Sequence, residues 1–479
     1  MIIKRLYDDG LAQASWLVGC AATGEALVVD PNRDIERYVQ AAAAEGLRLT
    51  HVTETHIHAD FVSGLRELAT RTGARAYLSA EGGPDWQYGF ADELDAVLLR
   101  DGDVIRVGNV RVQVLHTPGH TPEHLSFLVT DTAGADRPMG AFTGDFIFVG
   151  DVGRPDLLEK AAGIRNTMAA GARQLYASLQ RFKELPDFLQ LWPGHGAGSA
   201  CGKALGAVPQ STLGYERLFN WGLAAPSEQQ FVGDVLAGQP EPPKYFAVMK
   251  RVNREGPRLL HSWPSPPRLA PAAFRERLAA GAPVIDLRTR AEFSRAHLPG
   301  TLSIPFNRSF STWAGSLLSY ERDLYLVTPA ALVAAAVRQL ALIGMDRVAG
   351  WVDSGDLELP PARVAEVDAA EACARLADAD VTILDVRGRS EWDAGHAPVD
   401  AGAAVRHIPL GDLPDRLHEL PRDRPLLVHC QAGARSAMAV SLLEAHGFTN
   451  ATNVRDGFDG WRAAGCPVQR ETVLAGASS

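Results

Sequence analysis

A segment in the C-terminal half of this chain recurs after a constant offset of 99 residues. In both copies an apolar run ends in Asp-x-Arg, a Glu with an aromatic neighbour follows, and then a histidine. The matched segments are Val284–Arg288 with Ile383–Arg387, Glu292-Phe293 with Glu391-Trp392, and His297 with His396. An apolar run that ends in polar residues is typical of a buried strand reaching a loop. The repeat therefore predicts two domains built on the same scaffold.

Each copy continues with a second apolar run and a helical stretch. The apolar runs are Leu324–Val327 and Leu426–His429, and the helical stretches are 330–342 and 434–446. Alternation of strands and helices favours a parallel sheet covered by helices. Both copies are therefore expected to be α/β domains.

The N-terminal half has a different pattern. Short strand-like runs at 26–29, 110–115 and 125–129 alternate with helical stretches at 35–45 and 64–72. Polar clusters follow the strand-like segments, where α/β folds usually place their sites.

Proline-rich segments divide the chain. They lie at 241–244, 263–267 and 360–361, and prolines resist helix and act as semi-rigid spacers. We therefore predict three domains, and their ranges are 1–255, 268–358 and 364–472.

Composition excludes several classes of function. Among 479 residues, 57 are acidic and 47 basic, which disfavours nucleic-acid binding because phosphate affinity rests on excess Lys and Arg. No uncharged apolar stretch approaches the roughly 18 residues that suggest a membrane span, and Asp8 and Asp9 interrupt any N-terminal signal. The five cysteines are odd in number and far apart, which argues against a disulfide framework and for reduced thiols in a cytoplasmic protein.

Four segments of the first domain concentrate residue types that bind metals. They are Thr55–Asp60, Thr117–Thr121, Phe142–Asp145 and Pro193–His195. Imidazole and carboxylate together suit divalent zinc or iron. One such segment alone is more often a turn cap or a satisfied core histidine, but four of them, each after a predicted strand, predict a metal site.

This set resembles the metallo-β-lactamase superfamily, whose signature is His-x-His-x-Asp-His followed by later His, Asp and His ligands. The resemblance implies an αββα sandwich, followed here by two rhodanese-like α/β domains with parallel sheets. Phe61 stands where the family has its third motif histidine, a ligand of the second metal. Because phenylalanine has no lone pair to donate, a two-metal hydrolase site of the glyoxalase II type is impaired.

The remaining residues resemble the persulfide dioxygenase branch, which holds one Fe(II) by two histidines and one aspartate. The resemblance implies one iron per chain, with positions open for substrate and dioxygen, and the ligands His56, His120 and Asp145. Three further residues would orient these ligands and bound water; they are His58, Asp60 and His195.

Two residues near this predicted site have competing interpretations. Arg154 is a candidate for gripping a carboxylate of a thiol carrier, because its planar fork suits bidentate recognition. The alternative is a structural salt bridge with Asp151 or Asp156. Cys201, six residues after His195, is either a persulfide carrier or a small buried side chain.

A loop of the third domain, His429–Ser436, lies between a predicted strand and a predicted helix. Such a loop points successive N–H groups inward, and the helix N-terminus adds partial positive charge. Cys430 is therefore predicted to react as a thiolate nucleophile. Arg435 is predicted to stabilise the anion, and the other residues of the cradle are Gln431, Ala432, Gly433, Ala434 and Ser436.

The spacing within this loop separates two chemistries. Four residues lie between Cys430 and Arg435, whereas cysteine phosphatases have five. The tighter loop resembles the rhodanese sulfurtransferases, as do Asp385-x-Arg387, Glu391-Trp392, His396 and Gly457-Phe-x-Gly-Trp461. The resemblance implies that Cys430 accepts a sulfane sulfur.

The second domain lacks this loop. Thr328 falls near the position of Cys430, and Pro329 with Ala330 replaces the cradle. This predicts an inactive copy that acts as a spacer or an assembly surface. Three other cysteines are predicted to be structural; they are Cys20, Cys373 and Cys466.

The domain order resembles persulfide dioxygenase–rhodanese fusions that carry two rhodanese modules. It implies oxidation of a low-molecular-weight thiol persulfide by O2 to sulfite and thiol, coupled to sulfur transfer that forms or consumes thiosulfate, in sulfide detoxification. A homodimer or homotetramer is expected. The alternatives are a glyoxalase II-like thioester hydrolase fused to a sulfurtransferase, and a non-catalytic sulfide sensor or sulfur-carrier scaffold. The carrier thiol and the direction of transfer stay open.

Overall fold

The computed structural model describes residues 1–160, 167–360 and 362–470, and the chain divides into two compact units. Unit 1 comprises Met1–Trp263 with Ala341–Gly344, and unit 2 comprises Pro264–Leu340 with Met345–Ser479. Among the helices of the described residues, none combines the length and apolar composition needed to cross a membrane.

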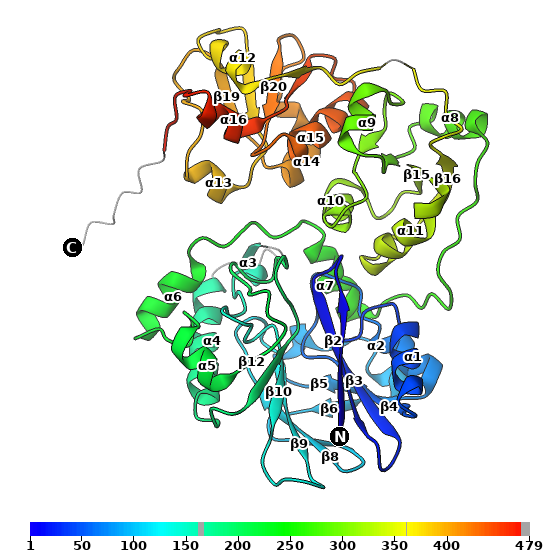
Figure 1. Cartoon of the computed structure of the whole chain (residues 1–479), viewed down its shortest axis with the longest axis vertical. Coiled ribbons are helices and arrows are strands. Elements are labelled where there is room, and N and C mark those ends of the chain that lie inside the picture. The colour runs from blue at the N-terminus through cyan, green and yellow to red at the C-terminus, as the bar shows by residue number, and fades with distance from the viewer. Residues whose placement is uncertain (161–166, 361, 471–479) are drawn as a thin grey trace. The chain divides into compact units, whose positions relative to one another are not determined.

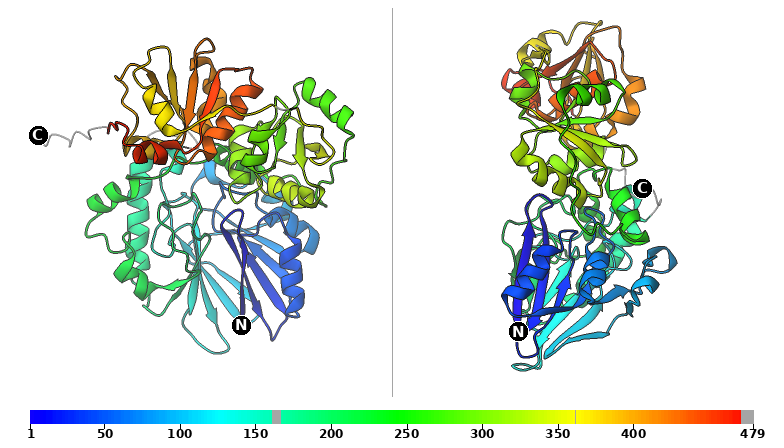
Figure 2. Two further views of the ribbon diagram at one scale, coloured as in Figure 1. Left: turned by 45° about the horizontal axis from the view of Figure 1, so that its top comes forward. Right: turned by 90° about the vertical axis from the view of Figure 1, so that its right-hand side faces the viewer.

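Two six-stranded sheets form the centre of unit 1 (Figures 1 and 2). The strands of the first sheet, in spatial order, are β1 (Ile2–Asp8), β2 (Gln13–Cys20), β3 (Glu25–Val29), β4 (Arg48–Thr53), β5 (Arg75–Ser79) and β6 (Val97–Leu99). Those of the second are β12 (Ser211–Thr212), β11 (Gln190–Pro193), β10 (Gly140–Gly144), β9 (Leu125–Asp131), β8 (Val110–His116) and β7 (Val104–Val107).

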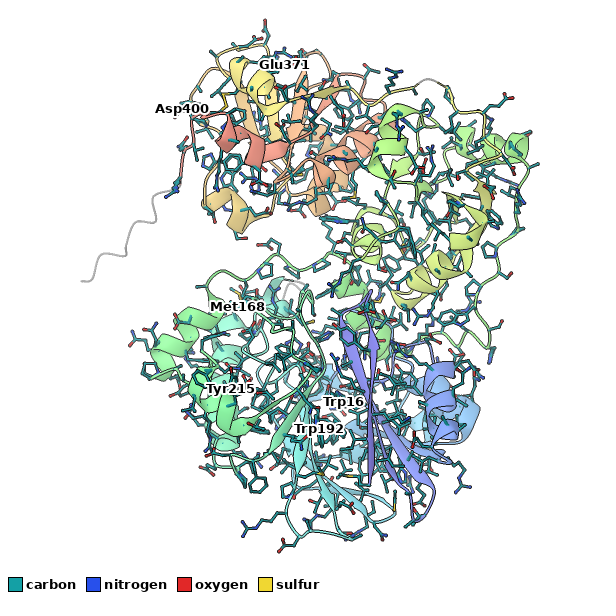
Figure 3. All side chains as sticks on the ribbon, in the orientation of Figure 1. Trp16, Met168, Trp192, Tyr215, Glu371 and Asp400 are labelled. Atoms are coloured by element: carbon teal, nitrogen blue, oxygen red, sulfur yellow. A yellow bond between two sulfur atoms is a disulfide. The ribbon has the colours of Figure 1, made fainter. Side chains whose placement is uncertain are left out.

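Apolar side chains on both faces of the strands hold this sandwich together. In β3, Leu27 and Val29 belong to the core between the sheets, whereas Val28 packs toward the helices on the outer face. Successive strand residues point to opposite faces, so a continuous apolar run is buried on both. Trp16 and Trp192 lie in the inner core with ring centroids 6.0 Å apart (Figure 3).

Helices cover the outer faces of both sheets. α1 (Glu36–Ala44) and α2 (Leu65–Thr72) contribute Tyr38 and Leu68 to the core on the first sheet, and α4 (Met168–Phe182) contributes Leu175 to the core on the second. The other helices of unit 1 are η1 (Pro84–Trp86), η2 (Asp92–Leu94), α3 (Leu157–Lys160), α5 (Leu213–Phe219), α6 (Glu228–Leu236) and α7 (Phe246–Glu255). The predicted αββα sandwich is confirmed.

Unit 2 contains two all-parallel sheets. The strands of the first, in spatial order, are β14 (Leu302–Ser303), β13 (Val284–Asp286), β15 (Leu324–Thr328) and β16 (Val348–Asp353). Those of the second are β17 (Glu366–Val367), β21 (Ala451–Val454), β20 (Leu426–His429), β18 (Thr382–Asp385) and β19 (Ala404–His407). The predicted parallel α/β class is therefore confirmed in this unit.

Short helices connect these strands. Around the first sheet they are α8 (Pro271–Ala279), α9 (Arg290–Arg295), α10 (Phe310–Leu317), η3 (Ala330–Leu332) and α11 (Val333–Leu342). Around the second they are α12 (Ala369–Ala374), α13 (Arg389–Asp393), η4 (Leu410–Asp412), α14 (Leu413–Arg416), η5 (Leu417–Glu419), α15 (Ala434–Ala445) and α16 (Gly457–Ala463).

The repeat is retained in the side-chain contacts. In each copy the Arg of Asp-x-Arg pairs with its Asp and donates to a carbonyl eight residues later. The histidine that follows stacks on the aromatic residue before it, with ring centroids 4.1 Å apart for Phe293–His297 and 3.9 Å apart for Trp392–His396. The Asp-x-Arg pair and the stacked rings therefore shape the loop after the first repeat strand.

The structure corrects the expectation of reduced thiols at one place. Cys373 and Cys466 form a disulfide, with Cα atoms 6.1 Å apart. The two residues are separated by 93 positions in the sequence, and they meet because α12 packs against α16. Both cysteines keep a structural role, but as a bonded pair.

Candidate functional site

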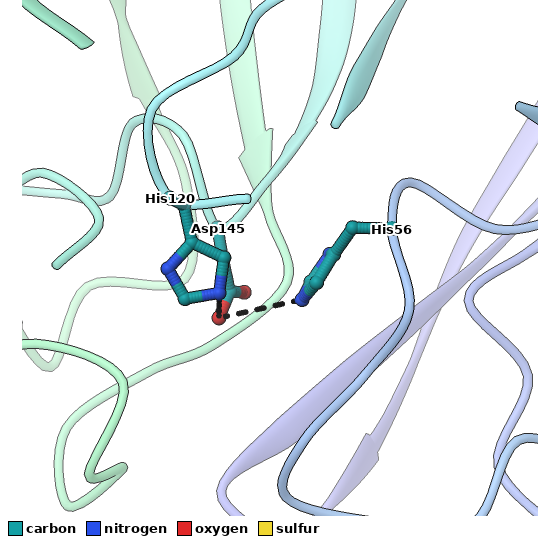
Figure 4. A group of neighbouring side chains, drawn as sticks. All are labelled: His56, His120 and Asp145. Carbon is teal, nitrogen blue, oxygen red and sulfur yellow. Dashed lines mark ion pairs between the residues drawn. The ribbon is translucent and has the colours of Figure 1, made fainter. Parts of the chain in front are cut away.

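Three side chains from separate loops of unit 1 converge on one point (Figure 4). His56 follows β4, His120 lies between β8 and β9, and Asp145 directly follows β10. Asp145 Oδ2 lies 3.5 Å from His120 Nε2 and 4.0 Å from His56 Nε2. One potential ligand atom of each residue lies within 4.8 Å of the others, and all three side chains are buried.

Hydrogen bonds fix which ring nitrogen of each histidine faces this point. The Thr55 hydroxyl donates to the Asp30 carboxylate, so its oxygen accepts from Nδ1–H of His56 at 2.9 Å. The Nδ1–H of His120 donates to the Arg154 carbonyl at 3.1 Å. A neutral imidazole that donates through Nδ1 keeps its lone pair on Nε2. Both lone pairs therefore face Asp145.

Charge and burial fit a cation at this point. Burial and the neighbouring His58 hold the pKa of His56 well below its usual value, and burial also lowers the pKa of His120 although Asp145 opposes it. Neither carboxylate oxygen of Asp145 has a hydrogen-bond partner among the described residues. A buried carboxylate without a partner is costly, so two lone pairs and one carboxylate suit a divalent metal.

His58 lies beside His56, with ring centroids 4.3 Å apart, and contacts Asp30. Its Nε2 lies 3.1 Å from Asp30 Oδ1. Burial disfavours the charged imidazole, but the charge and hydrogen bond of Asp30 raise the pKa of His58 to about 9. The observed partner of His58 is therefore Asp30. Asp30 in turn orients Thr55 and, through it, His56.

A second buried group lies beside the first. It comprises Asp60, His195 and Cys201, whose potential ligand atoms lie within 4.8 Å of one another. His195 Nε2 lies 3.3 Å from Asp60 Oδ2 and 3.4 Å from Asp145 Oδ1. Burial, together with the nearby carboxylates of Asp145 and Asp60, raises the pKa of Cys201 well above its usual value. Phe61 is fully buried and adds no ligand atom.

Arg154 has the structural role that the sequence left as its alternative. The side chain is fully buried, and its Nε and Nη2 donate to the two carboxylate oxygens of Asp156 at 2.8 and 2.7 Å. The remaining Nη contacts are the carbonyls of Ala200 and Pro240. The prediction that Arg154 grips a substrate carboxylate is corrected, because its donors are already engaged inside the domain.

Replacement of Arg154 by methionine tests this correction. The change breaks a buried ion pair and leaves the negative charge of the Asp156 carboxylate buried without its partner. We therefore expect the unfolding free energy of unit 1 to fall by about 3–5 kcal/mol. The matched control is Arg181→Ala, which breaks an exposed pair with Asp101 and is expected to cost less than about 1 kcal/mol. Denaturant unfolding measures both values. A stable Arg154→Met protein with a raised KM for persulfide would restore the substrate-binding interpretation.

The Cys430 loop of unit 2 connects β20 to α15. Cys430 is buried, and Ser436 Oγ donates to its sulfur at 3.5 Å. Gly433 has a φ of +81°, and a Cβ there would lie 1.9 Å from the Arg455 carbonyl oxygen, so only glycine fits. The backbone N–H groups of 431–433 donate to no described residue, which leaves them available to an anion.

Neighbouring elements hold this loop in place. The Phe458 and Asp459 amides of α16 donate to the carbonyls of Cys430 and Gln431. Arg435 donates through both Nη atoms to Glu391, each at 2.6 Å. Glu391 raises the pKa of Arg435 against the effect of burial. Arg435 is therefore fixed by Glu391, and the loop is held by amides of α16, the helix that carries the Gly457-Phe-x-Gly-Trp461 motif.

Strand register places the corresponding residue of the other copy. Asp385 is the parallel partner of His429, and Asp286 is the parallel partner of Val327. The residue after each partner is therefore equivalent, and Thr328 occupies the position of Cys430. Pro329 and η3 follow it, so this copy has neither the thiol nor the loop.

Two family profiles match separate parts of this chain. A profile of the metallo-β-lactamase superfamily matches residues 8–195, and a profile of the rhodanese-like domain matches residues 368–464. The chain is 34% identical over 157 residues to a hydroxyacylglutathione hydrolase from Methylobacterium nodulans. That match covers 33% of this chain and spans about half (52%) of the relative.

Two solved structures are also similar. ETHE1 from Myxococcus xanthus is 31% identical, with 53% of this chain and 98% of that chain covered and a TM-score of 0.44. A metallo-β-lactamase from Staphylococcus aureus is 44% identical, with 74% of this chain and 99% of that chain covered and a TM-score of 0.69. The chain therefore belongs to the metallo-β-lactamase superfamily and carries a C-terminal rhodanese-like domain.

Proposed function

We propose that unit 1 is a non-haem iron persulfide dioxygenase and that Cys430 of unit 2 is a sulfurtransferase nucleophile. The observation that carries the proposal is the set His56, His120 and Asp145, two neutral imidazoles and one carboxylate around one point. This is the donor set of mononuclear Fe(II) oxygenases, which leaves coordination positions open. Phe61 supports one metal rather than two, because it offers no ligand atom.

In the proposed reaction, water is a reactant and supplies the third oxygen of sulfite. A low-molecular-weight persulfide reacts with O2 and water to give the thiol, sulfite and a proton; the outer sulfur gains both atoms of O2 and one oxygen of water. Bound Fe(II) would offer the open positions for persulfide and dioxygen and would activate the dioxygen, while the outer sulfur of the persulfide would supply the electrons that reduce both oxygen atoms. His56 and His120 would present their Nε2 lone pairs, and Asp30 with Thr55 would hold His56 in the required tautomer.

Three neighbouring residues would control the surroundings of the metal. Asp60 and His195 would hold a water molecule in reach of the reacting sulfur, since they lie beside Asp145. Cys201 is a candidate persulfide carrier because it adjoins the same group.

The third domain would use the sulfite that the first produces. Cys430 would take a sulfane sulfur from a donor and pass it to sulfite, which forms thiosulfate, or it would work in reverse and charge a thiol from thiosulfate. The loop amides and the N-terminus of α15 would stabilise the anionic sulfur. The proposed role is sulfide detoxification.

A metal-dependent thioester hydrolase is the second candidate. It is favoured by the similarity to hydroxyacylglutathione hydrolase and by the second buried group, whose members Asp60 and His195 remain in place. Phe61 argues against it, because the second metal would lack its usual histidine.

One experiment separates these two candidates. We expect protein purified without added metal to contain about one iron per chain, as the donor set implies, and to consume oxygen when glutathione persulfide is added. The measurements are elemental analysis and an oxygen electrode. Two zinc ions per chain, hydrolysis of S-lactoylglutathione and no oxygen uptake would instead establish the hydrolase.

A further inference from the structure

Unit 2 contains a cavity of about 620 Å³ that the sulfur-transfer chemistry described so far does not use. The cavity lies at the carboxyl ends of β13 and β14 and against the first turn of α15; these elements are found in Figure 1 near the labels α9, α10 and α15. The cysteine-less copy therefore provides one wall, and the helix that follows the Cys430 loop provides the other. Ligands of parallel α/β domains bind at this end of the strands.

The wall of the cavity carries a positively charged side chain. Arg290 lines it, and its Nη1 lies 3.5 Å from the Ala432 carbonyl oxygen. Among the described residues no carboxylate lies within ion-pair distance of Arg290. The neighbouring Arg288 and Arg435 are both paired, with Asp286 and Glu391 respectively. Arg290 is therefore the cation of this wall that is available to a ligand.

Size and lining indicate an organic ligand. A volume of about 620 Å³ matches pockets for drug-sized molecules and far exceeds what thiosulfate or sulfite needs. Phe306, Trp313 and Met438 give the cavity apolar surface, and Asn307 adds an amide. An anion with an organic body fits this combination, because guanidinium recognises a carboxylate while the apolar groups cover the remainder.

The cavity reaches the start of α15, which directly follows the loop that carries the nucleophile. Ala434 and Arg435 line the cavity and form the start of α15, a few residues after Cys430. A Cβ on Gly433 would lie 2.8 Å from Arg290 Nη1, which shows how closely the guanidinium approaches the loop. A molecule held by Arg290 is thus placed beside the anion cradle.

We propose that the cysteine-less copy supplies a carboxylate-binding subsite, centred on Arg290, for the low-molecular-weight thiol that exchanges sulfur with Cys430. This inference rests on the proposed sulfur transfer at Cys430. In that transfer the S–S bond of the carrier persulfide breaks and a new S–S bond forms at Cys430. The electron pair leaves on the carrier thiolate, so no external oxidant or reductant is needed. Arg290 is a specificity residue that touches the carrier and not the reacting sulfur.

The role of the Arg290 charge is tested by comparing the kinetics of glutathione persulfide with those of its diethyl ester. Arg290→Gln keeps a donor for the Ala432 carbonyl but removes the charge. We expect its KM for glutathione persulfide to rise about tenfold or more, as for loss of a charge-assisted hydrogen bond, with kcat unchanged. The KM for the diethyl ester of the same persulfide should stay the same. The assay is anaerobic thiosulfate formation from sulfite, corrected for the Cys430→Ser background.

The matched control is Arg295→Gln, a change of an exposed arginine on the same helix, which should leave both KM values unaltered. A KM for glutathione persulfide that does not change in Arg290→Gln overturns the subsite. Equal increases for acid and ester also overturn it, because they indicate a damaged loop and not a lost charge.

A binding measurement keeps the subsite testable if Cys430 proves inactive. In hydrogen-exchange measurements on the full chain, binding of S-methylglutathione should slow the exchange of backbone amides within 301–313 and 434–438. The protection should vanish in Arg290→Gln and persist in Arg295→Gln. Absence of protection in the unchanged protein, or its persistence in Arg290→Gln, would overturn the subsite independently of turnover.

Discussion

Replacement of Cys430 by serine is expected to abolish sulfur transfer, with a loss of at least about 10³-fold, while oxygen uptake and sulfite release continue. The serine hydroxyl stays protonated at neutral pH and its oxygen does not form a stable persulfide. The fold should tolerate the change, because the two side chains are close in size and the loop is held by the amides of α16. Thiosulfate formation and an oxygen electrode trace measure the two activities on one sample.

The control for this variant is Cys20→Ser, a buried thiol of unit 1 that contacts neither site. It should retain both activities. Thiosulfate formation that survives in Cys430→Ser would show that another thiol carries the sulfur, and Cys201 would be the first to examine because it is buried beside the candidate metal site.

Replacement of Asp145 by asparagine is expected to remove iron and oxygen uptake together. Asp145 is the one carboxylate of the predicted ligand set, and its oxygens are buried without hydrogen-bond partners among the residues that the structure describes. An amide of the same shape removes the negative charge that offsets the cation. We expect metal affinity to fall by at least about 100-fold, since changes to groups outside the ligand set already cost 10–100-fold. Elemental analysis after dialysis gives the occupancy.

The matched control is Asp151→Asn, which changes a buried carboxylate that does not face the candidate ligands. Its oxygens accept hydrogen bonds from the Lys203 and Ala204 amides and from Trp221. This variant is expected to lose about 1–3 kcal/mol of stability and to keep its iron. Sulfur transfer by Cys430 should persist in both variants. Iron retained at full occupancy in Asp145→Asn would contradict the proposed ligand set.

The elements of the fold were predictable where the local pattern is strong. The predicted run 426–429 is β20, and the predicted helices 64–72 and 434–446 correspond to α2 and α15. β20 is an apolar run, and both helical stretches are periodic and bounded by glycine. In each segment the local preference of the residues and the burial of their side chains favour the same structure. The helix predicted over 330–342 begins with a 3-10 turn, Ala330–Leu332, because Pro329 fixes the backbone at its start.

The site was predictable in its residue types and less so in their arrangement. The resemblance to the persulfide dioxygenase branch implied the ligands His56, His120 and Asp145, but the role of Asp30 was missed, since it follows β3 more than 20 positions before the motif. The sequence left two interpretations of Arg154, a substrate-binding one and a structural one. The contacts that decide between them, with the carbonyls of Ala200 and Pro240, join segments that are distant in the sequence. The cavity beside Arg290 is likewise formed by residues more than 100 positions apart.

The amino-acid sequence alone determined the α/β class, the internal repeat, the absence of a third motif histidine at Phe61 and the length of the Cys430 loop. Those properties depend on local patterns and on residue identity. Only the tertiary structure decided which ring nitrogens face Asp145 and that Arg154 is buried in an ion pair. It also decided that Cys373 bonds to Cys466 and that the cysteine-less copy and α15 line a common cavity. These features depend on contacts between distant segments, and such contacts are set by the packing of whole sheets and helices.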